Sequence, residues 1–260
     1  MEALLRFGVF ALILLLMASW EALRPTRLLN QQRRQRWLVN LGLAALNVAV
    51  MRLSIGAAAW LTANWAAEQH IGLFNQLPLP HWLSIALSLL LLDLAIYAQH
   101  IAAHRWQWFW RLHQVHHSDI DFDTSTAVRF HPLEIMLSML YKVALVAALG
   151  APPLAVIAFE IILNGCALFN HGNVSLPPTF EHCLRYVLIT PDLHRIHHSA
   201  WQAETDSNYG FSLSCWDRWF KTLCPQPRAD MIIGLHGFRD TKELGFWPLL
   251  AMPFRPLRKR

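Results

Sequence analysis

Histidine is the residue whose number and spacing in this 260-residue chain point most directly to chemistry. Three histidine groups form motifs: HxxxH at His100 and His104, HxxHH at 113–117, and a second HxxHH at 194–198. His171 stands alone between the second and third groups. With 14 histidines in the chain, one HxxHH arises by chance about 0.04 times, so two together are not accidental.

The spacing of these motifs suits metal binding. Residues four apart on a helix face the same way, so His100 and His104 are expected to point into one cavity. In HxxHH the first two histidines share a helix face and the third lies beside them, so one helical turn can serve two neighbouring ions. Eight or nine imidazoles exceed what one ion uses, because a catalytic zinc takes three protein ligands. We therefore expect two metal ions, and imidazole alone does not choose among Zn, Cu, Fe and Ni.

An all-imidazole site is expected to have carboxylates nearby that accept hydrogen bonds from the outer ring nitrogens. Asp93, Glu134 and Asp206 are the preferred candidates, and Asp93 shares a helical stripe with His100 and His104. A hydrogen bond between helices is the equal alternative for Asp93. Further candidates are Asp119, Asp121, Asp123 and Asp192.

Histidines outside the motif spacing are expected to have other roles. His131 and His182 are interpreted as structural or supporting residues. His70, His81 and His236 are interpreted as ordinary residues.

The composition predicts that these motifs lie in a membrane protein. Apolar residues make up 55% of the chain and charged residues 15%, against roughly 45–50% and about 25% in soluble domains. This composition excludes disorder, and a mean hydropathy of +0.29 argues against an ordinary soluble enzyme. The four cysteines have no CxxC spacing, so neither a disulfide framework nor a thiolate zinc site is expected.

Apolar runs long enough for membrane helices predict four or five spans. They cover about 4–20, 38–67, 82–98, 133–149 and 153–169. The second run is long enough to be tilted or broken, and the last two read as a helical hairpin joined at 150–153. The first run is interpreted as an anchor rather than a cleaved signal peptide, because no A-x-A site follows it.

Basic residues predict how the chain is oriented. Threading the five runs alternately places every Arg-rich connection on one side, which the positive-inside rule assigns to the cytoplasm. All the histidine motifs and the carboxyl terminus then lie at the cytoplasmic face. The net charge of +5 is thereby explained by orientation, and no nucleic-acid partner is expected.

At these residues the chain resembles the fatty acid hydroxylase / sterol desaturase superfamily. The resemblance lies in HxxxH, a short gap from His104 to His113, HxxHH and the distant second HxxHH. It extends to RFHPLE at 129–134, NHGN at 170–173, TPDLHRIHHS at 190–199, DSNYG at 206–210 and WDRWF at 216–220. About 93–222 is covered, half of the chain.

The resemblance implies an all-α integral membrane bundle whose cytoplasmic helical cap carries a di-iron centre. Such an enzyme is an oxidoreductase that uses O2 and two electrons to hydroxylate or desaturate a lipid such as a fatty acyl chain or sterol-like molecule. Carried over by motif, the implied ligands and catalytic residues are His100, His104, His113, His116, His117, His194, His197 and His198, with His171 as a ninth metal ligand. Some members have a further histidine just before the position of His171, where this chain has Asn170.

The resemblance also implies a set of partners. Electrons would come from a separate electron-transfer protein and reductase, because the chain has no flavin, dinucleotide or Fe–S motif. Iron is the expected metal, which zinc can replace in purified protein. The location would be the inner or cell membrane.

We expect the chain to form a single domain. Residues about 1–92 would be the membrane anchor, about 93–222 the catalytic region and about 223–260 the cytoplasmic tail. Two other functions stay open. A membrane zinc hydrolase would use the same histidines to activate water, although no HExxH is present. A transporter or sensor would bind metal without chemistry.

Overall fold

The computed structural model describes residues 2–54 and 57–258, and every regular element in this part of the chain is a helix. The first eight α-helices, all but α4 at least eleven residues long, are α1 (Glu2–Leu23), α2 (Arg33–Ser54), α3 (Ala58–Glu68), α4 (Leu73–Gln76), α5 (His81–Arg105), α6 (Gln107–His117), α7 (Pro132–Leu149) and α8 (Pro153–Asn170). The later ones are short: α9 (Pro178–Leu184), α10 (Pro191–His197), α11 (Gln202–Thr205), α12 (Cys215–Trp219) and α13 (Phe246–Ala251). Three 3-10 helices complete them: η1 (Thr124–Val128), η2 (Thr241–Leu244) and η3 (Met252–Phe254). The all-α prediction is confirmed.

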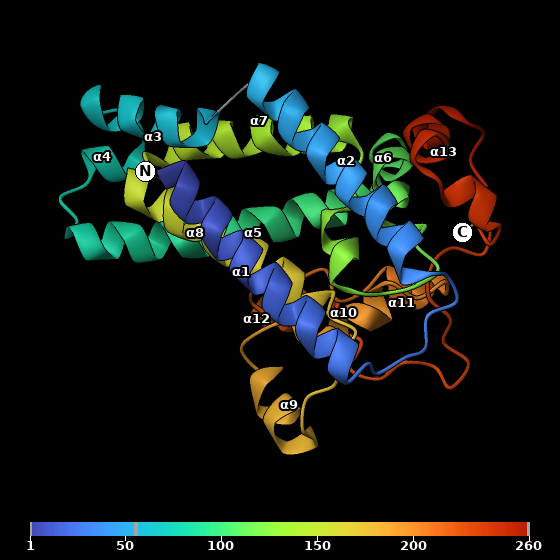
Figure 1. Cartoon of the computed structure of the whole chain (residues 1–260). Helices are drawn as coiled ribbons and strands as arrows, with labels where there is room; N and C mark the ends of the chain where they lie inside the picture. The colour runs from blue at the N-terminus through green and yellow to red at the C-terminus, as the bar shows by residue number, and fades with distance from the viewer. Residues whose placement is uncertain (1, 55–56, 259–260) are drawn as a thin grey trace.

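Five segments are long and apolar enough to cross a membrane, which agrees with the upper of the two predicted numbers. The second of them, Arg33–Gln76, contains α2, α3 and α4. The long second run is divided, since α2 ends at Ser54 and α3 begins at Ala58, with residues 55–56 outside the described part. Figure 1 shows α3 lying beside α7, which it contacts, rather than continuing the line of α2.

The first candidate membrane helix, α1, buries few side chains against protein. In α1 only Met17 and Glu21 are buried, whereas Leu4, Phe7 and Leu15 are more than half exposed. Exposed leucine and phenylalanine on a helix of this length are compatible with contact to lipid acyl chains. Protein contacts of this helix are mainly with α8.

The hairpin of α7 and α8 illustrates how local sequence determines the turns. His131 caps α7 by accepting a hydrogen bond from the Leu133 backbone N–H, and proline occupies the first position of both helices. Gly150 ends α7 with φ of 62°, and a Cβ there would lie 2.8 Å from the Ile71 carbonyl oxygen. Glycine is therefore required both by the left-handed conformation and by the close approach of the 71–75 loop.

Packing brings several helix ends together at the end of the bundle away from α4. The helices α6, α10, α11 and α13 lie there, near the carboxyl end of α5 (Figure 1). A core of Leu43, Trp110, Val115, Leu249 and Met252 joins α2 and α6 to the carboxyl-terminal segment. The ends of α5, α6, α8 and α10, which carry the histidine motifs, are thereby held close to one another.

Candidate metal centre

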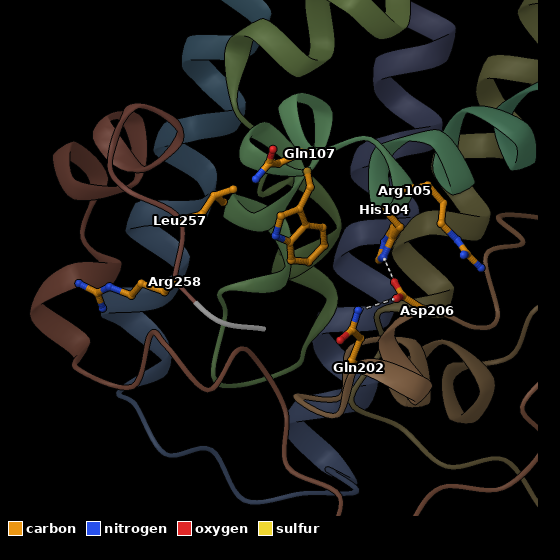
Figure 2. A pocket seen from close by; sticks show the side chains of 8 residues that line it. His104, Arg105, Gln107, Gln202, Asp206, Leu257 and Arg258 are labelled. Atoms are coloured by element: carbon orange, nitrogen blue, oxygen red, sulfur yellow. Dashed lines mark hydrogen bonds and ion pairs between the residues drawn. The ribbon is translucent and has the colours of Figure 1, made fainter.

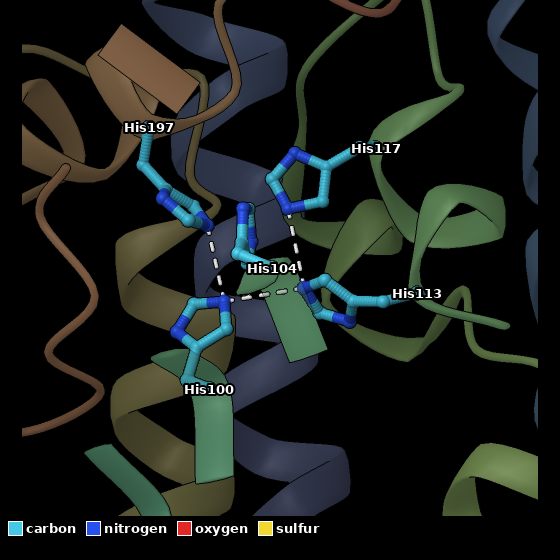
Figure 3. A group of neighbouring side chains, drawn as sticks. All are labelled: His100, His104, His113, His117 and His197. Atoms are coloured by element: carbon cyan, nitrogen blue, oxygen red, sulfur yellow. Dashed lines mark hydrogen bonds between the residues drawn. The ribbon is translucent and has the colours of Figure 1, made fainter. Parts of the chain in front are cut away.

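Five histidines from three helices converge on one point, and we call them the five-histidine group. They are His100 and His104 from α5, His113 and His117 from α6, and His197 from α10. The Nε2 atom of His100 lies 3.2 Å from that of His113 and 3.1 Å from that of His197. The His113 Nε2 atom lies 3.2 Å from that of His117. Figure 3 shows these rings directed toward a common centre.

Four further histidines form a second cluster, the four-histidine group. They are His116 on α6, His171 directly after α8, His194 on α10 and His198 directly after α10. The His171 Nε2 atom lies 3.2 Å from that of His116 and 3.1 Å from that of His194. The structure thus divides the nine histidines singled out in the sequence into two groups, and each HxxHH motif contributes to both.

Local helix structure accounts for this division. In α6, His113 and His117 are four residues apart and share a face, while His116 points to the neighbouring group. The short helix α10 begins at Pro191 and is capped by the Thr190 side chain, which accepts a hydrogen bond from the Leu193 backbone N–H. That cap stabilises the start of α10, and within this short segment His194 and His197 belong to different groups.

In several of these histidines, a hydrogen bond made by Nδ1 determines which ring nitrogen carries the proton. The Nδ1 atom of His100 lies 2.7 Å from the Tyr209 carbonyl oxygen, and that of His197 lies 2.7 Å from the Ser207 carbonyl oxygen. A carbonyl oxygen only accepts, so each Nδ1 donates and each Nε2 retains a lone pair. His171 makes the same contact from Nδ1 to the Ala167 carbonyl oxygen at 2.7 Å.

Two carboxylates extend this arrangement in the five-histidine group. His113 Nδ1 donates to Glu134 at 2.6 Å, and His104 Nδ1 lies 3.3 Å from Asp206. These contacts bring two of the three preferred carboxylates to histidines. The third is placed elsewhere: Asp93 accepts hydrogen bonds from the Trp216 indole N–H at 2.8 Å and the Leu213 backbone N–H at 3.3 Å.

The expectation for Asp93 as a histidine partner is therefore not met. Asp93 and His100 do lie on one helix, α5, as predicted, and His100 belongs to the five-histidine group. The helix turn that carries Asp93, however, faces the loop before α12 rather than an imidazole. The alternative role, a hydrogen bond that joins a membrane helix to another segment, is the one observed.

The geometry of both groups fits bound metal ions. Around one ion with metal–nitrogen bonds of about 2.0–2.1 Å, adjacent nitrogens lie about 2.9–3.4 Å apart. The Nε2 separations of 3.1–3.2 Å match this range. Lone pairs that face one another at such distances repel unless a cation lies between them. Within the described residues, neither ring nitrogen of the buried His198 has a hydrogen-bond partner, although it belongs to the four-histidine group.

Burial lowers the pKa of several of these imidazoles and favours their neutral form. All nine are at most 4% exposed. Burial is the largest cause that lowers the pKa of His171 to about 4 and that of His197 to about 3, from an ordinary value of 6.5. Burial and neighbouring imidazoles lower the pKa well below 6.5 for His116, His117, His194 and His198. Neutral imidazole is the form that binds a metal, so the site is prepared for coordination near neutral pH.

Aromatic side chains surround the imidazoles. Phe130 stacks on His116 with ring centroids 4.4 Å apart, and Trp110 lies 5.2 Å from His104. Phe211 lies 5.2 Å from His100 and also packs against side chains of the membrane helices. These aromatic rings shield the imidazoles they contact from water and leave an apolar contact on the side of the membrane helices.

A buried ion network supports the loop that follows α6. The Arg36 guanidinium donates to Asp119 at 2.8 and 3.0 Å and to Asp123 at 2.6 Å. Burial raises the pKa of Asp119, but Arg36 and Arg129 outweigh it and hold the pKa at about 2. Arg129 also donates to the Val115 carbonyl oxygen at 3.0 Å, inside the second motif. The network thus anchors the helix that carries three of the nine histidines.

Sequence reasoning did not assign Arg36 this role, because it was interpreted only as a charge that sets orientation. The alternating acids Asp119, Asp121 and Asp123 directly after the first HxxHH were a usable signal, since buried carboxylates require cations. Asp121 accepts hydrogen bonds from the backbone N–H groups of Asn30 and Gln31, so it ties the α1–α2 connection to the site.

The remaining histidines lie outside both groups. His131 is the cap of α7, and His182 is exposed and packs against Tyr186. His236 contacts Trp201. Asn170 donates from Nδ2 to the Phe211 carbonyl oxygen, while its Oδ1 is buried without a hydrogen-bond partner in the described chain.

Comparisons with known proteins agree with the motifs. The family model described as fatty acid hydroxylase matches residues 85–222. The ornithine lipid hydroxylase OlsE of Rhizobium tropici is 32% identical over 180 residues, which cover 67% of this chain and 51% of that protein. The alkylglycerol monooxygenase of Homo sapiens is 36% identical over 134 residues, 50% of this chain and 28% of that protein. The cholesterol 25-hydroxylase of Rattus norvegicus is 23% identical, over 56% of this chain and 48% of that protein.

The chain spans about half the length of the ornithine lipid hydroxylase and about a third of the alkylglycerol monooxygenases that it matches. No solved structure matches it.

Proposed function

Because the chain belongs to the fatty acid hydroxylase family, we propose that it is a multi-pass membrane oxygenase that oxidises a lipid with O2 and two electrons. The reaction is hydroxylation, or desaturation, of an unactivated C–H bond. The observation that carries this proposal is the pair of buried histidine groups at the ends of membrane-spanning helices. The relatives named above as hydroxylases and monooxygenases support the reaction class.

In this proposal the nine histidines of the two groups bind two metal ions, and the metal is iron. Imidazole binds iron and zinc alike, and the choice of iron is supported by the family's oxygenase members. A bound pair of iron ions would supply the activation of O2. This chain's own residues contribute in three ways.

The first contribution is orientation of the ligands. Glu134 and the carbonyl oxygens of Tyr209 and Ser207 accept the Nδ1 protons and hold the Nε2 lone pairs toward the centre. Partners of this kind raise ligand basicity and fix ring orientation.

The second contribution is exclusion of water. Burial by Phe130, Trp110 and Phe122 encloses the rings, with Phe122 lying 5.1 Å from His198. A dry site protects a reactive oxidant from side reactions.

The third contribution is access for a hydrocarbon chain. Phe211 contacts His100 on one side and the apolar cores of α1, α5 and α8 on the other. We propose that the lipid chain approaches from this side, in van der Waals contact with Phe211. The site lies at the membrane surface that we assign to the cytoplasm, where a separate electron-transfer protein and reductase would deliver electrons.

The substrate is proposed to be a polar membrane lipid. The names of the relatives specify an ornithine lipid, alkylglycerols and cholesterol, which all combine a polar end with a hydrocarbon portion. The proposal for this chain extends only to that shared amphiphilic character.

The test is turnover of a lipid extract by the purified, iron-loaded protein with a chemical reductant under ¹⁸O2. The expected result is one lipid class that gains one labelled oxygen or loses two hydrogens, with about two irons bound per chain. Turnover that continues without O2 in a zinc-loaded protein would support the hydrolase instead. Two bound metals with no turnover of any lipid would support a binding or transport role.

A further inference from the structure

A cavity of about 500 Å³ opens beside the five-histidine group, and the proposed oxidation does not by itself explain it. Its lining combines charged and amide side chains from three parts of the chain (Figure 2). These are Arg105 and Gln107 around the α5–α6 junction, Gln202 and Asp206 at α11, and Arg258 near the carboxyl terminus. Cavities of this volume are typical of small-molecule sites.

One residue of the cavity lining belongs to the candidate metal site. His104 lines the cavity and belongs to the five-histidine group. Asp206 lies 3.3 Å from His104 Nδ1, and Gln202 donates to the other Asp206 oxygen at 3.3 Å. The one carboxylate of the lining is therefore engaged by the protein itself, and its negative charge is partly offset.

The cationic side chains of the lining are differently placed. Arg258 forms an ion pair with Glu243 at 2.5 Å. Arg105 is exposed and makes no ion pair or hydrogen bond with any residue in the described chain. Arg105 is thus a guanidinium at the rim of the cavity whose donors are available to an anion, and guanidinium matches the geometry of phosphate and carboxylate groups.

The rim lies at the carboxyl end of a candidate membrane helix. Arg105 is the last residue of α5, which is one of the five candidate spans. The next residues include Trp106 and Trp108, which are 55% and 54% exposed. Exposed tryptophans at the end of a membrane helix mark the interface where lipid head groups lie.

We propose that this cavity binds the anionic head group of the lipid substrate, with Arg105 as its main contact. The inference rests on the proposed function, since it names the class of substrate for the same site. It follows that the oxidised C–H bond lies near the polar end of the lipid, because the floor of the cavity is a ring of the metal centre. A free phosphate ester shares the chemistry of a head group, and the test separates the two.

The binding test uses metal-loaded protein in maltoside detergent without O2, so no turnover is needed. Three probes are compared by native mass spectrometry: dioctanoyl phosphatidylglycerol, dioctanoylglycerol and glycerol 3-phosphate. We expect the anionic lipid to bind about tenfold more tightly than the other two, because only it combines chains with a charge for Arg105. Equal binding of glycerol 3-phosphate and the lipid would overturn the lipid assignment.

Arg105→Gln supplies the variant, and Arg34→Gln supplies the matched control. Arg34 is also exposed and begins a membrane helix, but it lies outside the cavity. We expect Arg105→Gln to remove most of the preference for the anionic lipid, while Arg34→Gln changes it less than twofold. Unchanged affinity in Arg105→Gln, or equal losses in both variants, would overturn the proposal.

A turnover measurement separates head-group binding from docking of an electron carrier. With a lipid that the wild type oxidises, we expect Arg105→Gln to raise KM about tenfold with a kcat change below twofold, and the labelled oxygen to lie near the head group. If Arg105→Gln slowed only reactions driven by a carrier protein, and not those driven by a chemical reductant, the cavity would serve carrier docking and the proposal would fail. Absence of turnover in the wild type would count against the proposed function and leave the binding result standing.

Discussion

The five-histidine group and the four-histidine group share α6 and the α10 segment but differ in their third segment, which is α5 in one and the end of α8 in the other, and they are supported differently. In the five-histidine group, His100, His113 and His197 each have an outer nitrogen bonded to a carbonyl or carboxylate oxygen at 2.6–2.7 Å. In the four-histidine group only His171 has such a partner in the described chain, while the Nδ1 atoms of His116 and His194 have none. The number of histidines and the number of hydrogen bonds that support their rings therefore fall together from one group to the other.

This difference teaches that similar motifs do not make equivalent metal sites. Outer hydrogen bonds are worth about 10–100-fold in metal affinity. We therefore expect the ion of the five-histidine group to be held permanently and the other ion to be more easily lost. The predictions that follow test this inequality.

The largest effect is expected from removing a ligand. His113→Ala should lower lipid oxidation at least 100-fold and remove one metal, because His113 is grouped with four other rings and its Nε2 atom lies 3.2 Å from those of His100 and His117. His194→Ala should abolish oxidation equally while the ion of the five-histidine group is retained. Product analysis and metal content per chain measure both changes.

His182→Ala is the control for these ligand variants. His182 is exposed, belongs to neither histidine group and packs against Tyr186. It should retain two metals and full activity. A His113→Ala protein that still oxidised lipid would show that this ring is not a ligand.

The second prediction concerns removal of metal from the unaltered protein. Graded addition of a chelator should remove one ion at about tenfold lower chelator concentration than the other, and the four-histidine group should be emptied first. Metal content at each step, combined with the two ligand variants, identifies which ion leaves. Simultaneous loss of both ions would contradict the inequality.

The third prediction addresses the carboxylates. Glu134→Ala should weaken metal binding in the five-histidine group about tenfold or more, because its bond to His113 is short and buried. Asp206→Asn should have a smaller effect, since its contact with His104 is 3.3 Å and its side chain is 19% exposed.

Asp93→Asn is the control for these carboxylate variants and should leave metal affinity unchanged, because Asp93 contacts Trp216 and no imidazole. Metal competition titrations measure all three variants. If Asp93→Asn weakened metal binding as much as Glu134→Ala, the supporting role of direct contacts would be wrong.

The smallest effect is expected from pH on the metal-free protein. The pKa of His171 is lowered to about 4 and that of His197 to about 3, whereas the unfolded chain protonates its histidines near 6.5. Below pH 6.5 the unfolded state binds more protons, so the stability of the folded protein falls as the pH falls toward about 3. Thermal unfolding across pH 4–8 measures this slope, and bound metal should flatten it. A metal-free protein equally stable at pH 4.5 and 7 would contradict the neutral, buried histidines.

Much of this architecture follows from local patterns. Hydrophobic runs predicted the membrane helices, and the spacing of His100 with His104 predicted a shared helix face that the structure contains. Those features depend on residues close in sequence, for which helix periodicity is sufficient.

Features that depend on how distant segments pack were not predictable in this way. For Asp93 the sequence left two roles equally open, a partner of the histidines or a hydrogen bond between helices, because its position on the helix does not say which segment lies opposite that turn. Its partner Trp216 is 123 residues away. Likewise, the acids at 119–123 predict that a cation lies near them, but that this cation is Arg36 depends on α2 packing against η1.

The contact of Arg36 with Asp119 and Asp123 has a consequence for how the protein can be divided. Together with Glu21, which accepts hydrogen bonds from the backbone N–H groups of Thr124 and Asn173, it makes the first two helices part of the support for the histidine loops. A fragment that began at α5 would lack Arg36 and leave Asp119 and Asp123 without this ion-pair partner. Breaking a buried ion pair in this way costs about 3–5 kcal/mol of folding free energy. Grafting the histidine segment onto foreign membrane helices would therefore require the arginine to be transplanted with it.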